Sequence, residues 1–434
     1  MVVLICGASG FIGSRLCEVL AGAGHRVLRG VRQPRDANDV AIDFERDTDL
    51  AQWSPKLAGV DAVVNAVGSM KSESLDLVHF RVPVALFDAC VKAGVTRVVQ
   101  ISALGPSEAA AFLATKHAAD AHLMRLPLDW TVLRPSLVVG RDGASSRWFR
   151  CLASLPIVPL PGRGEQRLRP VALDDLCEAI KHCLAGKGVH SIVEVVGPRE
   201  ITYRAMLDAY RQRMGIGKGV YLPIPLAIAR SAVAMARPFA PQLINRDSLR
   251  MLQAGNRADA SATAHLLGRP PRPFVDGLGN ALPESLRAEA TWRWGELLLR
   301  LALAAVWLAT AWVSLFAHPI LDSLRMLWRM GVPVWSAPLL LVGAALLDAV
   351  FGVLTLLRPS RRLWVVQLGV IAGYSAIIAW RLPEMLIHPF GPIVKNLPIV
   401  AILLLLLAAT PSRGRSSACA PRANVGPNED AQQR

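Results

Sequence analysis

The sequence has few charged side chains. Only 19% of its 434 residues are Asp, Glu, Lys or Arg, whereas 53% are hydrophobic. Soluble domains average about 25% charged residues, so this composition is typical of a protein that contains membrane-spanning segments. It excludes a disordered chain, a collagen-like repeat and a small disulfide scaffold. At roughly 150 residues per domain, the length predicts two or three domains.

Cysteines are also few, and their spacing forms no recognisable pattern. The seven cysteines include no CxxC pair, and their number is odd, which indicates neither a zinc site nor a disulfide framework. Most lie within apolar runs, where a free thiol behaves as a small hydrophobic side chain. We therefore expect a reducing compartment for the chain before residue 290, and we expect no metal site.

The sequence lacks a nucleic-acid-binding pattern despite its net charge of +15. It has no run of five basic residues and none of the usual nucleic-acid motifs. Lys and Arg accumulate in the cytoplasmic loops of membrane proteins, where they face anionic lipid. We therefore predict membrane lipid, and no nucleic acid, as a partner. We also expect no signal peptide, because Val2–Ile5 is too short for its hydrophobic region and leads directly into glycines.

Residues 1 to about 150 alternate short apolar runs with segments of helical periodicity. The expected strands are Val2–Cys6, Arg26–Val31, Ala62–Ala66, Arg97–Ser102, Trp130–Arg134 and a weaker one at Val40–Phe44. Continuous apolar strands that alternate with helices are typical of a parallel sheet covered on both faces. We therefore predict an α/β Rossmann-type, doubly wound parallel sheet over residues 1–150. Residues 151–290 are predicted to complete this domain with a small substrate subdomain.

A glycine-rich segment follows the first expected strand and opens the first expected helix. In a dinucleotide-binding turn the first glycine allows a tight turn, the second lets the backbone approach a pyrophosphate, and the third permits close helix–strand packing. The phosphates then lie at the helix N-terminus, beside free N–H groups. A merely structural turn is the alternative. The predicted cofactor-binding residues of this segment are Gly7, Ser9, Gly10, Phe11, Ile12 and Gly13.

The end of the second expected strand distinguishes between the two nicotinamide cofactors. An NAD site carries an Asp or Glu there, which holds the ribose 2′-hydroxyl. Here Val31 stands where that acid is expected, and Arg32 follows it. Arg32, together with Arg29, can make charge-assisted contacts to the 2′-phosphate of NADP. We therefore predict NADP rather than NAD, the alternative being two arginines that only face solvent.

Residues 226–237 predict an apolar helix that carries Arg230 and Arg237 on one face. Such a helix can lie on a membrane surface. The alternative is a helix of the substrate subdomain that packs on the core. No pattern in residues 140–190 or 220–275 specifies a substrate.

Several segments together resemble the short-chain dehydrogenase/reductase superfamily, in its extended or atypical branch, over residues 1 to about 285. They are Gly7–Gly13, Asn65–Gly68, Ala93–Val95, Gln100–Ala103, Asp129–Ser136 and Pro170–Leu176. The sequence is most similar to the complex I accessory-subunit-like and NmrA-like NAD(P)-binding groups. The resemblance implies that Asp43 lies near the adenine and that Asn65–Gly68, with Ala66, lines the cofactor.

The catalytic set of that superfamily is only partly present. The resemblance assigns Ser102 to the catalytic serine, and Lys116 to the lysine that holds the nicotinamide ribose and lowers the pKa of the tyrosine. The tyrosine position is Phe112, which has no proton to give. His79 replaces the asparagine of the superfamily and can supply a proton near neutral pH, the alternative being a structural histidine. The four tyrosines of the chain lie far away in the sequence, at Tyr203, Tyr210, Tyr221 and Tyr374.

From Leu297 the sequence becomes much more apolar. Four membrane spans are predicted, at about 297–317, 335–357, 363–380 and 390–410, since about 20 apolar residues cross a bilayer core. The fourth is weaker, because Lys395 and Asn396 interrupt it. The number of spans resembles the DoxX-like family of all-α four-helix transmembrane bundles over residues 291–412, and this resemblance implies a link to quinones. Residues 413–434 are predicted to form a disordered tail.

The charges between the spans favour two cytoplasmic termini. Arg358, Arg361 and Arg362 lie between the second and third spans, in agreement with the positive-inside rule. We therefore predict a multi-pass protein of the cytoplasmic (inner) membrane, with the Rossmann domain in the cytoplasm. Asp348 in the second span is expected to face the bundle interior, with Tyr374 or Ser375 as its partner. Its alternative role is helix–helix hydrogen bonding without a function.

These features predict a membrane-anchored NAD(P)H-binding oxidoreductase that prefers NADP and passes reducing equivalents to a lipophilic, quinone-like acceptor. The alternative, suggested by Phe112, is a catalytically impaired protein. Such a protein would act as an NADP(H) sensor or as an assembly module of a membrane complex.

Overall fold

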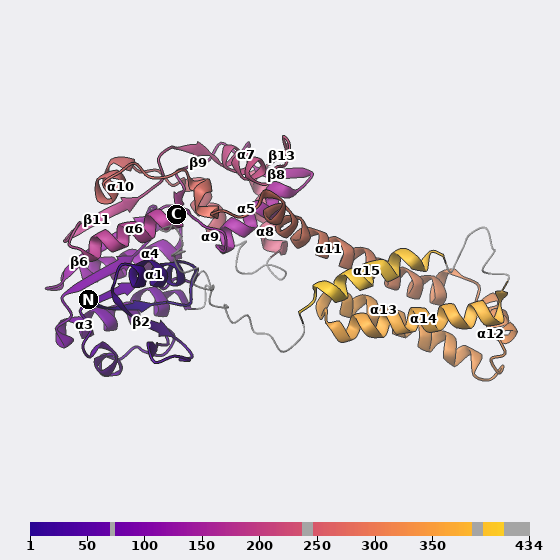
Figure 1. Cartoon of the computed structure of the whole chain (residues 1–434). Coiled ribbons are helices and arrows are strands. Elements are labelled where there is room, and N and C mark those ends of the chain that lie inside the picture. Colours follow the sequence, from indigo (N-terminus) through magenta and orange to yellow (C-terminus); the bar gives the residue numbers. More distant parts are fainter. Residues whose placement is uncertain (70–73, 237–245, 384–393, 412–434) are drawn as a thin grey trace, which may run out of the picture. The chain divides into compact units, whose positions relative to one another are not determined.

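The computed structural model describes residues 1–69, 74–236, 246–383 and 394–411. The chain divides into two compact units, Met1–Trp292 and Arg293–Arg434. Figure 1 shows strands and helices in the first unit and long helices in the second. The predicted tail and the first residues of the predicted fourth span lie outside the described residues.

A seven-stranded parallel sheet forms the centre of the first unit. Its strands, in spatial order, are β11 (Ser191–Val195), β6 (Asp129–Pro135), β5 (Arg97–Ile101), β4 (Ala62–Asn65), β1 (Val2–Cys6), β2 (Arg26–Val31) and β3 (Asp39–Ala41). The chain runs outward from β1 to β3 and then returns to β4, so the strand order reverses between β1 and β4. Ligands of open α/β sheets bind at such a switch point, outside the carboxyl ends of the strands.

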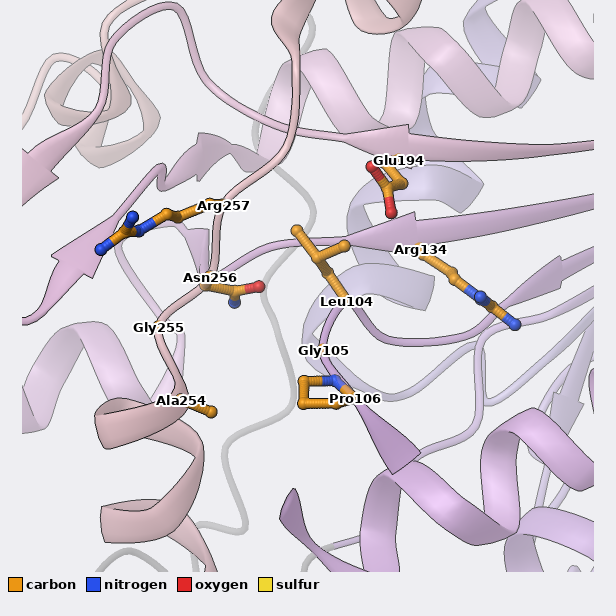
Figure 2. A pocket seen from close by; sticks show the side chains of 9 residues that line it. All are labelled: Leu104, Gly105, Pro106, Arg134, Glu194, Ala254, Gly255, Asn256 and Arg257. Carbon is orange, nitrogen blue, oxygen red and sulfur yellow. The ribbon is translucent and has the colours of Figure 1, made fainter. Parts of the chain in front are cut away.

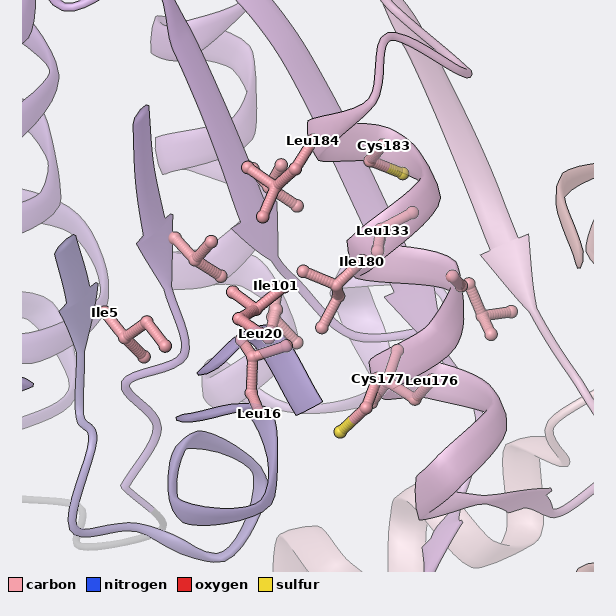
Figure 3. Close-up of a cluster of buried hydrophobic side chains, with 14 of the residues drawn as sticks. Ile5, Leu16, Leu20, Ile101, Leu133, Leu176, Cys177, Ile180, Cys183 and Leu184 are labelled. Carbon is pink, nitrogen blue, oxygen red and sulfur yellow. The ribbon is translucent and has the colours of Figure 1, made fainter. Parts of the chain in front are cut away.

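Both faces of the sheet are covered by helices. The covering helices are α1 (Phe11–Gly22) and α6 (Leu173–Leu184) on one face, and α2 (Leu50–Trp53), α3 (Val82–Ala93) and α4 (Ala111–Leu123) on the other. Along β1, Val3 and Ile5 join the first core, whereas Leu4 and Cys6 join the second. Figure 3 shows the first core, in which side chains of α1 and α6 meet those of the strands. The predicted doubly wound sheet is therefore confirmed.

One expected strand differs markedly in its extent, whereas three others differ by a single residue at one or both ends. The weaker run Val40–Phe44 forms only the short β3, which ends at Ala41. Ile42 and Phe44 leave the ladder, but their side chains are buried in the second core beside Trp53. The apolar run therefore reports burial correctly, although it overstates the length of the strand.

The chain after β6 adds a subdomain with its own core. Its elements are β7 (Val138–Val139), α5 (Ala144–Ser154), β8 (Ile157–Pro161), β9 (Arg167–Leu168), β10 (Val171–Ala172), β12 (Ile201–Thr202), α7 (Tyr203–Arg213), β13 (Val220–Ile224), α8 (Leu226–Ala236) and α9 (Arg246–Ala254). The later helix α10 (Ala260–Leu267) instead packs on the first core, beside α6 and β11. Thr202 caps α7, because its hydroxyl accepts a 3.0 Å hydrogen bond from the Ala205 N–H. Val158, Leu160 and Tyr210 are buried together in this third core.

Long apolar helices make up the second unit. The helices are α11 (Pro283–Trp312), which begins in the first unit, α12 (Ile320–Arg329), α13 (Ala337–Leu357), α14 (Arg361–Arg381) and α15 (Asn396–Ala409). Within the described residues, three stretches are long and apolar enough to cross a membrane, namely Pro283–Ala317, α13 and α14. The predicted fourth span corresponds to α15, whose 14 residues are fewer than the roughly 20 that a span requires. Helix α12 was not predicted.

A chain of polar side chains lies inside the second unit. The Trp307 indole N–H donates to Gln367 Oε1 (3.1 Å), and Gln367 Nε2 donates to Thr355 Oγ1 (3.0 Å). Asp348 is buried as expected, but its Oδ1 has no hydrogen-bond partner among the described residues. The predicted partner Ser375 is instead hydrogen-bonded to Asn396 Nδ2 at 3.0 Å.

Candidate functional site

The glycine turn lies at the switch point of the sheet, between β1 and α1. Gly7 has a φ of +80°, which L side chains rarely adopt, and its carbonyl accepts a 2.9 Å hydrogen bond from the Gly10 N–H. A Cβ on Gly13 would lie 2.1 Å from the same carbonyl oxygen. Ser9 and Gly10 remain exposed ahead of the first turn of α1. The segment therefore forms the tight turn and close helix–strand contact that a pyrophosphate site requires.

The loop after β4 closes the other side of this turn. A Cβ on Gly7 would lie 3.1 Å from Val67 Cγ2 and 3.3 Å from the Ala66 backbone. Asn65 fixes the loop, because its Nδ2 donates to Gln100 Oε1 (2.8 Å) and its Oδ1 accepts from the Val67 N–H (3.2 Å). The structure thus brings the predicted residue Ala66 beside the glycine turn.

Two further glycines, which the sequence analysis missed, lie against Phe11. A Cβ on Gly140 or Gly143 would approach the Phe11 ring to 2.8 or 2.9 Å. The Phe11 side chain therefore holds the loop that precedes α5. Its N–H belongs to the first turn of α1, and the Phe11 and Ile12 side chains both pack on the first core.

The two arginines near the end of β2 differ in their surroundings. Arg29 is engaged in ion pairs with Asp39 (2.7 Å) and Asp36 (3.1 Å). The Arg32 side chain is 71% exposed, and its only ion pair within the described residues is a 3.8 Å contact with Glu45. Arg32 is therefore free to meet a phosphate, whereas Arg29 would first have to leave two carboxylates.

Asp43 shapes the loop after β3. Its Oδ1 accepts a 3.0 Å hydrogen bond from the Glu45 N–H, and its own N–H donates to Asp47 (2.8 Å). The Asp43 side chain nevertheless remains partly exposed. Arg32 directly follows β2, and the Asp43 loop follows β3. Because β2 and β3 are parallel, Arg32 and the loop lie at the same edge of the sheet.

Lys116 lies on α4 and connects the ends of β4 and β5. Its Nζ donates to the Ile101 carbonyl at 2.8 Å and to the Val67 carbonyl at 3.1 Å. The side chain is buried, and this burial lowers the pKa of Lys116 to about 8. The amine therefore lies next to the loop that faces the glycine turn, where the resemblance expects the nicotinamide ribose.

Phe112 occupies the space between Lys116 and His79. The Lys116 Nζ lies 5.8 Å from the centre of the Phe112 ring, and the His79 ring meets the Phe112 ring edge-on at 5.0 Å. Phe112 is one helical turn before Lys116, as the tyrosine of the superfamily would be. No hydroxyl is therefore offered at this position.

His79 is buried in a short π-helical turn, Leu77–Arg81. Its Nε2 accepts a 3.0 Å hydrogen bond from the Ser69 N–H, which places the ring proton on Nδ1, 3.3 Å from Thr115 Oγ1. Burial and, to a smaller extent, the charge of Lys116 lower the pKa of His79 to about 3. The imidazole is therefore neutral near pH 7, which argues against the proton-donor role predicted for it and favours the structural alternative.

Ser102 belongs to a network that the sequence analysis missed. Its hydroxyl donates to Asp120 Oδ2 at 2.6 Å, and Arg134 Nη2 donates to the same oxygen at 3.2 Å. Asp120 is completely buried and lies one helical turn after Lys116 on the same face of α4. That i, i+4 spacing was the available signal in the sequence. The network directs the Ser102 hydroxyl to a carboxylate.

Arg134 also lines a cavity of about 520 Å³ at the carboxyl ends of β5, β6 and β11. Figure 2 shows its walls, which consist of Leu104, Gly105, Pro106, Arg134, Glu194 and the segment Ala254–Arg257. Asn256 Oδ1 is buried and has no hydrogen-bond partner among the described residues. Glu194 and Arg134 are register partners on neighbouring strands, so their side chains share one face. The cavity is polar, and it begins two residues beyond Ser102.

Two families match separate parts of the chain. Residues 7–147 match the NAD(P)H-binding family, and residues 304–404 match the DoxX-like family. The first match contains the glycine turn, Arg32, Asp43, Lys116 and Phe112. The second contains α13 and α14 and most of α15.

Curated proteins are similar to more than half of the chain. The "Epimerase family protein Mb2239" of Mycobacterium bovis is 28% identical over 262 residues, which cover 54% of this chain and 84% of that protein. The mitochondrial "NADH dehydrogenase [ubiquinone] 1 alpha subcomplex subunit 9" of Arabidopsis thaliana is 26% identical over 281 residues, which cover 58% and 69%. The human "Epimerase family protein SDR39U1" is 26% identical over 272 residues, which cover 55% and 88%.

Solved structures share the fold. The crystal structure of gox2253 aligns with a TM-score of 0.52 and 20% identity, covering 68% of this chain and 98% of that one. A double mutant of DesIV, a dTDP-glucose 4,6-dehydratase from Streptomyces venezuelae with NAD and DAU bound, aligns with a TM-score of 0.50 and 21% identity, covering 68% and 97%. The chain therefore combines an NAD(P)-binding domain that is similar to epimerase-family and short-chain dehydrogenase/reductase-like proteins with a C-terminal DoxX-like membrane domain.

Proposed function

We propose that this chain is a membrane-anchored oxidoreductase that prefers NADP and passes reducing equivalents to a lipophilic, quinone-like acceptor. The observation that carries the proposal is the juxtaposition of the glycine turn, the Ala66–Val67 loop and the Lys116 amine at one switch point. The union of this site with long apolar helices in one chain supports an acceptor that is dissolved in the membrane.

Different residues of the first unit would bind different parts of the cofactor. Gly7, Gly10 and Gly13 would hold the pyrophosphate at the N-terminus of α1, where free N–H groups favour negative charge. Arg32 would bind the 2′-phosphate, because a guanidinium forms charge-assisted hydrogen bonds with it. The nicotinamide ribose would lie against Lys116. Asp43 remains a prediction for the adenine end.

The chemistry that this site supports is limited by Phe112. NADPH, when bound, supplies a hydride from its nicotinamide ring. Phe112 has no proton to donate, and the neutral His79 is already engaged with Ser69 and Thr115. A quinone suits these conditions, because its second hydrogen can come from water. The overall reaction then consumes one NADPH, one quinone and one solvent proton, and it yields NADP⁺ and one quinol.

We further propose that the first unit lies in the cytoplasm, next to the inner membrane. Three arginines lie where α13 connects to α14: Arg358 directly follows α13, and Arg361 and Arg362 are the first two residues of α14. A cluster of this kind favours the cytoplasmic side of a bilayer. Reporter fusions at residue 359 and within the connection 330–336 test the orientation, and opposite sides are expected for the two positions.

A second candidate function is an NADP(H)-binding sensor or assembly module without turnover. Phe112 favours it, and so does the bond from Ser102 to the buried Asp120, which keeps the hydroxyl of the serine occupied. The relative that is named as a subunit of NADH dehydrogenase [ubiquinone] also supports a role within a membrane complex. Binding of the cofactor is common to both candidates.

The full-length protein in lipid nanodiscs tests both candidates. We would measure NADPH binding by fluorescence, NADPH oxidation with a short-chain quinone, and reduction of a set of simple ketones. The variants are Phe112→Tyr, which restores the hydroxyl, and Phe112→Leu, which controls for the change of the ring. We expect the wild type to oxidise NADPH with quinone and to leave the ketones unreacted.

The other outcomes are equally informative. NADPH binding without quinone turnover, together with ketone reduction by Phe112→Tyr alone, would support the sensor. Failure to bind NADPH and NADH would contradict both candidates.

A further inference from the structure

One surface of the subdomain carries large apolar side chains that face solvent. Val220 on β13 and Ile157 on β8 are register partners, and they are 63% and 56% exposed. Leu222, two residues after Val220, is 54% exposed, and Ile228 on α8 is 57% exposed. Since alternate residues of a strand share a face, Val220 and Leu222 lie on the same side of the β8–β13 pair. Ile228 follows on α8, the helix that comes directly after β13 in the chain, and we call the exposed side chains Ile157, Val220, Leu222 and Ile228 the apolar face.

The opposite side of the same strands is tightly packed. Val158 and Leu160, which alternate with Ile157 along β8, are buried in the third core. Leu286 and Ala290, from the beginning of α11, are buried in that core as well. The strands are therefore firmly held, and the exposure of the apolar face reflects its orientation. Exposed apolar side chains that lie next to one another, unlike single ones, mark contact surfaces.

The chain itself keeps this surface close to the membrane. Ala290 is packed in the core beneath the β8–β13 pair, and the apolar run of the first span begins at Leu297. Seven residue steps, even when fully extended, reach only about 25 Å. The subdomain that carries the apolar face therefore stays near the bilayer, whatever the arrangement of the two units.

The charges around the apolar face suit anionic lipid. Lys218 precedes Val220 by two residues, and Arg230 follows Ile228 by two. Both side chains are exposed, and neither takes part in an ion pair within the described residues, while Arg230 Nη2 donates a 3.3 Å hydrogen bond to the uncharged Gln253 Oε1. Apolar side chains flanked by basic ones are the combination by which proteins settle into the interfacial region of a bilayer.

We propose that the apolar face lies in the headgroup region of the anchoring membrane, with Lys218 and Arg230 bound to anionic phospholipid headgroups. A second copy of the chain is a weaker candidate, because stable interfaces bury about 800 Å² on each partner, more than four aliphatic side chains offer. The tether, by contrast, supplies lipid at high local concentration. The inference is independent of any redox activity of the cofactor site.

Spin labels in the full-length protein test this contact. Cys17 and Cys419 would first be replaced by serine, because the other five cysteines are buried. A label would then be attached to Val220→Cys or, as the matched control, to Ile192→Cys, an exposed apolar position on β11. In nanodiscs containing phosphatidylglycerol, collisions with lipid-soluble oxygen and with a water-soluble nickel chelate would be compared.

We expect the label at 220 to collide severalfold more with oxygen relative to nickel than the label at 192 does. The double substitution Lys218→Glu and Arg230→Glu should lower the ratio at 220 and leave it unchanged at 192. A label at 220 that behaves like the one at 192 would overturn the proposal. Protection of 220 from both reagents, with spin–spin broadening, would also overturn it and would assign the face to a second copy.

Discussion

The two ends of the candidate cofactor site, at the glycine turn and at Lys116, differ in how closely they match a dinucleotide-binding site. At the glycine turn, Gly7, Gly10 and Gly13 leave room for the close backbone contacts that such a turn requires. At the other end, Lys116 is held by two backbone carbonyls, but the neighbouring ring is Phe112. The first end has the three glycines that such a turn is expected to have, whereas the second has Phe112 where the similar superfamily has the hydroxyl of a tyrosine.

This difference separates binding from chemistry. Recognition at the turn would depend on backbone N–H groups and on the absence of side chains, so it does not require the hydroxyl that Phe112 lacks. Proton transfer depends on one hydroxyl, which Phe112 does not have. Lys116 is an example, because its hydrogen bonds to the Ile101 and Val67 carbonyls fix the position of its amine without any tyrosine.

The largest effect is expected when the turn itself is filled. Gly13→Ala places a methyl group 2.1 Å from the Gly7 carbonyl oxygen, so the helix or the turn must move. Overpacking of this kind costs about 1–3 kcal/mol of stability. We expect that cost in urea unfolding and more than tenfold weaker NADPH binding, measured by fluorescence titration.

Gly22→Ala is the matched control in the same helix. A Cβ on Gly22 meets nothing within 4 Å, and alanine is the better helix former by about 1 kcal/mol. This variant should be slightly more stable than the wild type and should bind NADPH equally well. If both variants behaved alike, the close packing at Gly13 would have no part in binding.

The sheet and the turn could be predicted because their signals are local. Short apolar runs identified β1 and β4, which are almost entirely buried, and runs that also contain polar residues identified β2, β5 and β6. The Gly7–Gly13 segment needs only its position between a strand and a helix to be interpreted. The three long apolar helices followed in the same way from length and hydropathy.

Side-chain partners could not be predicted in the same way. The neutral state of His79 follows from the Ser69 N–H and from burial, neither of which a sequence pattern encodes. The bond from Ser102 to Asp120 joins residues on different elements. In the membrane unit, Asn396 Nδ2 donates a hydrogen bond to Ser375, which was one of the two partners expected for Asp348.

The preference for NADPH over NADH tests the end of the site that contains the glycine turn and Arg32. Arg32→Asp should weaken NADPH binding about 10- to 100-fold and should favour NADH, because charged hydrogen bonds contribute about 1.5–3 kcal/mol. Arg26→Asp, at the opposite end of β2, is the control for net charge and should change both affinities little. Equal losses in the two variants would show that Arg32 acts only through the overall field.

At the Lys116 end of the site, NADPH affinity should depend on pH. Burial lowers the pKa of Lys116 to about 8, so the amine loses its charge as the pH rises through that value. NADPH affinity should therefore fall by up to about tenfold between roughly pH 7 and pH 9, since one pKa unit corresponds to about 1.4 kcal/mol. Lys116→Met should bind more weakly at pH 7 and lack this inflection, while Lys92→Met, an exposed control, retains it. An inflection that survives in Lys116→Met would belong to another group.

The smallest expected effect is that of His79 on the pH dependence of the free energy of unfolding. Its pKa is lowered to about 3 in the folded protein, while an unfolded histidine titrates near 6.5. The unfolded chain therefore binds the extra proton, and stability falls as the pH decreases, by about 1 kcal/mol between pH 6.5 and 5.5. His79→Gln keeps an acceptor for the Ser69 N–H and should flatten this slope in urea unfolding, whereas the exposed His265→Gln should not. An unchanged slope in His79→Gln would mean that His79 carries a proton in the folded state, and the acid role predicted for it would return.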